Sequence, residues 1–127
     1  MSTLQPPSSP PAVLVVEDER ALLELTREMF EQLGCRVLSA ESGEAGLALF
    51  QREPVNFVFT DLRLGGMGGD GLIDALIAQN PGVAIVATSA LLEELDVVRL
   101  KWGKRVRYLL KPYRMNDLRA ILAMDVV

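Results

Sequence analysis

Charged and hydroxyl side chains stand directly at the ends of four short apolar runs of the 127-residue sequence. They are Glu17, Asp18, Asp61, Ser89 and Lys111. If each apolar run is a strand of one parallel sheet, these side chains meet at a single edge of that sheet. Three carboxylates in one crevice repel each other, by roughly 4 kcal/mol for a pair at about 4 Å. Protonation, a lysine or a divalent cation would relieve the repulsion, and carboxylates suit Mg²⁺ or Mn²⁺.

The same residues could handle a phosphoryl group. Lys111 supplies a positive charge and Ser89 supplies a hydroxyl donor beside the acidic cation site. Together these groups can stabilise a phosphoryl group in transfer. Because the sequence has no nucleotide-binding loop, we expect one of the carboxylates to accept the group as an acyl phosphate. The chain contains no histidine, which excludes a Ser-His-Asp triad and a histidine metal site.

Short predicted strands that alternate with longer predicted helices would position these residues. Strands are predicted at 12–16, 36–39, 57–60, 84–88 and 106–110, and helices at 20–33, 43–52, 71–79, 91–101 and 116–124. Five strand–helix units in a row predict an α/β fold with a parallel sheet and helices on both faces. In the first helix, apolar side chains recur at steps of three or four residues and predict its apolar face: Leu22, Leu25, Met29 and Leu33.

Length and composition limit the classes of protein to which this chain can belong. The chain is long enough for one domain, and half of its residues are hydrophobic, which excludes wholesale disorder. No apolar run approaches the roughly 20 residues of a membrane-spanning helix. The single cysteine, Cys35, suits a reducing cytoplasm. Residues 1–11 contain four prolines and are expected to form a flexible lead before one domain at 12–127.

The net charge of −4 is unevenly distributed. Residues 99–127 hold eight basic and two acidic groups, whereas the residues before them hold five basic and fifteen acidic groups. The asymmetry is either a drift among solvated helix faces or a basic docking face near the C-terminus. No direct DNA binding is expected, because a basic patch within an acidic chain is a weak signal for nucleic acid.

Four segments carry a resemblance to a known family. They are VLVVEDE (13–19), FTDLRL (59–64), ATSA (87–90) and YLLKPY (108–113). In this order and at these spacings they resemble the receiver domain of bacterial two-component response regulators, including the chemotaxis regulators. The resemblance covers residues 12–124 and implies a single-domain, flavodoxin-like (βα)5 sandwich with strand order 2-1-3-4-5.

The resemblance implies an acceptor and a metal site. Asp61 would take a phosphoryl group from a sensor histidine kinase or a histidine phosphotransfer protein, as in a phosphorelay. Mg²⁺, with Mn²⁺ as the alternative, would be bound by Asp61 and directly by Asp18. Glu17 would act mainly through a bound water, and the backbone carbonyl of Arg63 would complete the metal shell.

The resemblance also implies a switch. Ser89 would hydrogen-bond one phosphoryl oxygen, and Lys111 would neutralise another. Tyr108 would swing inward when Ser89 moves and would relay the signal to the face formed by the last two helices and the last strand. An unidentified downstream protein would bind that face. The Lys111–Pro112 peptide bond is expected to be cis.

The sequence departs from the family pattern after the acceptor. The segment LGGMGGDG (64–71) lacks the usual proline and has about two extra residues, so we expect a mobile loop there. This loop favours an alternative, a degenerate receiver that binds partners independently of phosphorylation.

Two enzyme classes are further alternatives. A nucleotide-binding enzyme on a flavodoxin-like sheet needs a phosphate loop after the first strand, where Glu17, Asp18 and Glu19 would repel phosphate. A phosphatase with an aspartate nucleophile would normally carry that residue after its first strand. We therefore expect a cytoplasmic regulatory phosphoacceptor rather than an enzyme, one that promotes only its own phosphotransfer and dephosphorylation.

Overall fold

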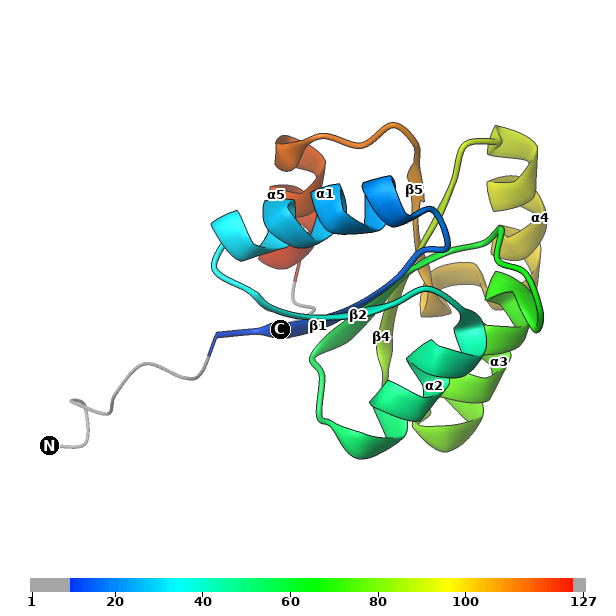
Figure 1. Cartoon of the computed structure of the whole chain (residues 1–127). Coiled ribbons are helices and arrows are strands. Elements are labelled where there is room, and N and C mark those ends of the chain that lie inside the picture. Colours follow the sequence, from blue (N-terminus) through cyan, green and yellow to red (C-terminus); the bar gives the residue numbers. More distant parts are fainter. Residues whose placement is uncertain (1–9, 125–127) are drawn as a thin grey trace, which may run out of the picture.

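Five strands and five α-helices alternate in the computed structural model, which describes residues 10–124 (Figure 1). They are β1 (Ala12–Val16), α1 (Arg20–Gln32), β2 (Arg36–Ala40), α2 (Gly43–Arg52), β3 (Phe57–Asp61), α3 (Gly68–Gln79), β4 (Ala84–Ser89), α4 (Leu92–Trp102), β5 (Arg107–Leu110) and α5 (Met115–Ala123). Most of the predicted flexible lead, residues 1–9, lies outside the described part. Within residues 10–124, no helix is long and apolar enough to cross a membrane.

All five strands are parallel, and their order is β2-β1-β3-β4-β5, as the resemblance implies. Helices α1 and α5 cover one face of the sheet, and α2, α3 and α4 cover the other (Figure 1). One apolar cluster, which includes Phe30 and Phe59, fills the first layer, and a second, which includes Leu14 and Leu72, fills the other. Because both faces are covered, β1 and β3 are buried along their whole length.

Helix α3 begins earlier than the sequence predicts. It starts at Gly68 rather than Gly71, so the predicted glycine-rich loop ends three residues sooner. The backbone of Gly69 lies against the end of β3, where a Cβ would stand 2.4 Å from the Asp61 carbonyl oxygen and 2.5 Å from the Leu62 Cα. The Gly69 N–H also donates to the Leu62 carbonyl at 3.2 Å. Glycine is therefore required at this position by close packing of backbone on backbone.

The buried face of α1 also differs from the predicted one. Leu23, Thr26 and Phe30 are its fully buried residues, whereas Leu25 is 53% exposed and the other three predicted face residues are half-buried. The Thr26 hydroxyl lies 2.6 Å from the hydroxyl of Tyr113, near the start of α5. The buried face of α1 thus includes a polar contact with Tyr113, which a pattern of apolar residues does not register.

Candidate functional site

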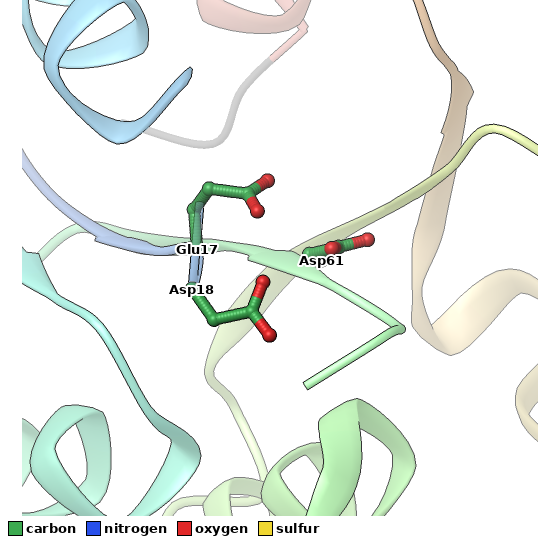
Figure 2. A group of neighbouring side chains, drawn as sticks. All are labelled: Glu17, Asp18 and Asp61. Carbon is green, nitrogen blue, oxygen red and sulfur yellow. The ribbon is translucent and has the colours of Figure 1, made fainter. Parts of the chain in front are cut away.

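Three carboxylates meet at the carboxyl ends of β1 and β3 (Figure 2). Val16 pairs with Thr60 in the sheet, so Glu17 and Asp18 leave β1 beside Asp61, the last residue of β3. Figure 2 shows the Glu17 and Asp18 side chains leaving the chain on opposite sides. One oxygen from each carboxylate lies within 4.8 Å of the other two. The predicted convergence of these three acids is therefore present in the structure.

Lys111 faces two of these carboxylates. It follows β5, whose last residue Leu110 pairs with Ser89 of β4. Its Nζ lies 2.9 Å from Oε1 of Glu17 and 3.3 Å from Oδ2 of Asp61. The Lys111–Pro112 peptide bond is cis, as expected. One ammonium and three carboxylates carry a formal charge of −2, so the donor set fits a divalent cation with oxygen ligands.

Burial and the charges within the cluster together set the pKa values of these groups. Burial raises the pKa of the Asp61 carboxyl and of the Glu17 carboxyl, although Lys111 opposes the shift in both. For Lys111, burial lowers the pKa, but the hydrogen bond to Glu17 and the charges of both carboxylates outweigh it and raise the pKa overall. Lys111 therefore stays charged, and the excess negative charge of the cluster is destabilising until a proton or a cation compensates it.

Ser89 and Arg63 lie beside the cluster, and both bind Glu94 in the first turn of α4. The buried Ser89 hydroxyl donates to one oxygen of Glu94 and accepts from the Leu91 N–H at 3.0 Å. The Arg63 Nε donates to the other Glu94 oxygen at 2.8 Å. Sequence reasoning did not identify Glu94, because an acid in the first turn of a helix is commonplace. The role of the Arg63 carbonyl as a metal ligand stays a prediction.

Tyr108 lies on β5, away from the carboxylates. Its half-buried ring has the Arg99 guanidinium 5.0 Å from its centroid. Its hydroxyl donates to the Gly103 carbonyl at 3.0 Å, in the turn that follows α4. Tyr108 therefore touches the C-terminal end of α4, while Ser89 touches the N-terminal end. The expectation that the two side chains move together stays a prediction.

The glycine-rich segment before α3 is held next to the site by α2. The Met67 N–H donates to Oε2 of Glu44 at 3.2 Å. Gly66 and Gly68 have φ angles of 66° and 74°, in the left-handed region that favours glycine. The segment thus turns tightly around the Glu44 carboxylate before entering α3.

Comparisons with known proteins agree with these observations. The family model for the response regulator receiver domain matches residues 13–123. The alginate biosynthesis transcriptional regulatory protein AlgB of Pseudomonas aeruginosa is 32% identical over 114 residues, which is 90% of this chain and 25% of that protein. The virulence sensor protein BvgS of Bordetella pertussis is 41% identical over 71 residues, which is 54% of this chain and 6% of that protein. The chain therefore spans a quarter or less of the length of these two relatives.

Solved structures share the fold. The receiver domain of a sensor histidine kinase from Pseudomonas aeruginosa, with a magnesium ion coordinated in its active site cleft, has a TM-score of 0.83 at 26% identity, covering 92% of this chain and 98% of that one. A CheY-like receiver domain protein from Methanospirillum hungatei has a TM-score of 0.81 at 28% identity, covering 93% and 94%. Sequence, strand order and site together show that the chain belongs to the response regulator receiver domain family.

Proposed function

We propose that Asp61 of this receiver domain accepts a phosphoryl group from the phosphohistidine of a sensor kinase or a histidine phosphotransfer protein. The observation that carries the proposal is the buried carboxylate of Asp61, which contacts Lys111 and lies within 4.8 Å of two further carboxylates. Membership of the receiver family supports it, since receivers are the phosphorylated partners in two-component signalling. The donor histidine comes from another protein or another domain, because these 127 residues contain none.

In the proposed step, an oxygen of Asp61 attacks the phosphorus of the phosphohistidine. The new O–P bond makes an acyl phosphate, while the P–N bond breaks and leaves its electron pair on the imidazole nitrogen, which then takes up a proton. Lys111, 3.3 Å from Asp61, would neutralise one phosphoryl oxygen. Ser89 would donate to another oxygen, which requires its hydroxyl to leave Glu94.

Mg²⁺ is the metal that we propose for the carboxylate cluster, and Mn²⁺ suits the same donors. Asp61 and Asp18 would bind the ion directly, and the backbone carbonyl of Arg63 would add a third ligand. When bound, the ion supplies positive charge that offsets the charge of the group in transfer. The formal charge of −2 on the cluster supports a divalent rather than a monovalent cation.

Glu17 would contribute to the metal site through water rather than directly. Its Oε1 accepts from Lys111 at 2.9 Å, and its Oε2 accepts from the Glu19 N–H at 3.1 Å. Both oxygens are therefore already bound to protein donors, and the side chain is buried. A water bridging Glu17 to the ion would leave these two hydrogen bonds in place.

The output surface in this proposal is the face formed by α4, β5 and α5, where a downstream protein would bind. Basic side chains gather on it: Arg99, Lys104 and Arg107 line one hollow beside β5. We propose that phosphorylation biases this face between two arrangements through Ser89 and Tyr108. The chain would act in the cytoplasm and would promote only its own phosphotransfer and dephosphorylation.

Intact mass spectrometry after incubation with acetyl phosphate tests the proposal. We expect the wild-type chain to gain one phosphoryl group in Mg²⁺ and none in EDTA. Asp61→Asn should gain none, whereas Asp70→Asn, which neutralises an exposed acid at the start of α3, should behave as wild type. Absence of any adduct, together with absence of Mg²⁺ binding, would refute phosphotransfer and leave a phosphorylation-independent binding module.

A further inference from the structure

Glu94 accepts hydrogen bonds from two donors that lie at the same edge of the sheet as the proposed acceptor. The Ser89 hydroxyl donates to one Glu94 oxygen, and the Arg63 Nε donates to the other at 2.8 Å. A hydroxyl has a single proton, so Ser89 cannot donate to a phosphoryl group while it donates to Glu94. The same two partners, the Ser89 hydrogen bond first, lower the pKa of Glu94 and keep it ionised.

The acceptor side chain and this network lie at the ends of neighbouring strands. Asp61 ends β3 and pairs with Thr88, the residue before Ser89 on β4. Arg63 follows Asp61 by two residues and reaches across to α4 to meet Glu94. A phosphoryl group on Asp61 would therefore arise at the same edge of the sheet as the two donors that Glu94 holds.

A phosphoryl group is a stronger competitor for these donors than Glu94. It carries a charge of about −1.5 to −2 near neutral pH and has three acceptor oxygens, whereas Glu94 carries one negative charge. The Glu94 side chain is also 30% exposed, so water can solvate it once its two donors leave. Exchange of the donors from Glu94 to the phosphoryl group is thus favourable in charge and leaves no carboxylate buried without a partner.

The first turn of α4 depends on this contact, because the helix is otherwise loosely packed. Of its eleven residues, Leu95 alone is fully buried, while Leu92 and Val97 are 56% and 66% exposed. A cavity of about 360 Å³ separates this turn from the start of α3. Its lining residues are Leu62, Asp70, Glu93, Glu94, Val97 and Val98. The helix therefore has room to move once Glu94 is released.

We propose that Glu94 is a positioning residue that occupies the Ser89 hydroxyl and the Arg63 guanidinium, and that a phosphoryl group on Asp61 takes both donors and releases the first turn of α4. The inference rests on the proposed function, because it requires a phosphoryl group at Asp61. It adds to that function a side chain that opposes the switch in the unphosphorylated chain. Loss of the Glu94 charge should therefore favour the phosphorylated arrangement.

Beryllofluoride, a noncovalent phosphoryl analogue, tests this competition in the presence of Mg²⁺. Calorimetric titration would compare the wild-type chain, Glu94→Gln and the control Glu93→Gln, which removes the same charge from an exposed neighbouring residue. We expect Glu94→Gln to bind the analogue about tenfold more tightly, since a neutral amide competes less well for the two donors. We expect Glu93→Gln to change the affinity less than twofold.

Hydrogen exchange of the Glu94 and Leu95 amides, which both donate to the Leu91 carbonyl, provides a second readout. In the wild-type chain, the analogue should lower amide protection in this turn, whereas in Glu94→Gln the protection should already be low without it. Equal affinities for Glu94→Gln and Glu93→Gln, or weaker binding by Glu94→Gln, would overturn the role of Glu94 and leave the proposed function standing. Absence of binding by every variant, wild type included, would overturn both the role of Glu94 and the proposed function.

Discussion

Replacement of Asp61 by asparagine should make the metal-free chain more stable, although it removes the proposed acceptor. The Asp61 carboxylate is 7% exposed and has one ammonium and two carboxylates as its charged neighbours. Asparagine has nearly the same shape and no charge, so it removes the repulsion from Glu17 and Asp18. Lys111 keeps an ion pair with Glu17 at 2.9 Å.

The size of the expected change in the free energy of unfolding follows from the distances between these charged groups. At an effective dielectric of about 20, Glu17 repels Asp61 by at least about 3.5 kcal/mol, because one oxygen of each lies within 4.8 Å of the other, and Lys111 attracts Asp61 by about 5 kcal/mol at 3.3 Å. The exposed Asp18 adds roughly 1 kcal/mol of repulsion through water. The charge interactions nearly cancel, so burial decides the sign and raises the pKa of Asp61. We expect Asp61→Asn to raise the free energy of unfolding by about 1 kcal/mol, because it removes a buried charge that its neighbours do not fully compensate.

Urea denaturation in EDTA at pH 7 measures this effect, with Glu28→Gln on the exposed side of α1 as a control for net charge. Because the pKa of Asp61 is raised in the folded chain, the folded state binds the proton more tightly than the unfolded state. The wild-type chain therefore regains stability as the pH falls through that pKa, and the advantage of Asp61→Asn should shrink towards pH 4. Saturating Mg²⁺ should stabilise wild type and have little effect on the variant. A lower urea midpoint for Asp61→Asn than for wild type in EDTA would refute the reasoning.

Four further substitutions have distinct expected outcomes in the same urea assay. Lys111→Met should lower the free energy of unfolding by about 3–5 kcal/mol at pH 7, because it leaves two buried carboxylates without their counter-charge; unchanged stability would show that water already solvates them. Tyr113→Phe should cost about 1–2 kcal/mol by leaving the buried Thr26 hydroxyl unpaired, and a second change, Thr26→Val, should recover most of that loss. Gly69→Ala should cost more than 2 kcal/mol and weaken Mg²⁺ binding, because its Cβ would stand 2.4 Å from the backbone at the end of β3. Gly71→Ala, whose Cβ would meet only a side chain at 3.6 Å, should be neutral or stabilising by up to about 1 kcal/mol.

The convergence of the site was predictable because of where strands end in a parallel sheet. Glu17, Asp61, Ser89 and Lys111 stand at or directly after the ends of parallel strands, and such ends share one edge of the sheet. The strand order alone is therefore enough to predict that these side chains lie close together. Glu94 depends instead on how α4 packs against the sheet, which neither its residue type nor its place in a helix determines.

Packing also explains where the predicted elements were inaccurate. Glycine has poor helix propensity, so a segment containing Gly68, Gly69 and Gly71 predicts a loop, although close contact with β3 allows a helix to begin at Gly68. In α1, apolar spacing favoured a face that includes Leu25, which the structure leaves 53% exposed. In each case a tertiary contact outweighs the local pattern.

The strand order has a consequence for association between copies of the chain. Strands β2 and β5 are the two outer strands of the sheet, and each begins with an arginine, Arg36 and Arg107. Exposed strand edges can pair with edges of other molecules and so start aggregation, and charged side chains and short strands discourage this. Strand β5 is only four residues long, and the Arg36 side chain is 49% exposed. Both edges of the sheet are therefore protected against pairing with strands of other molecules.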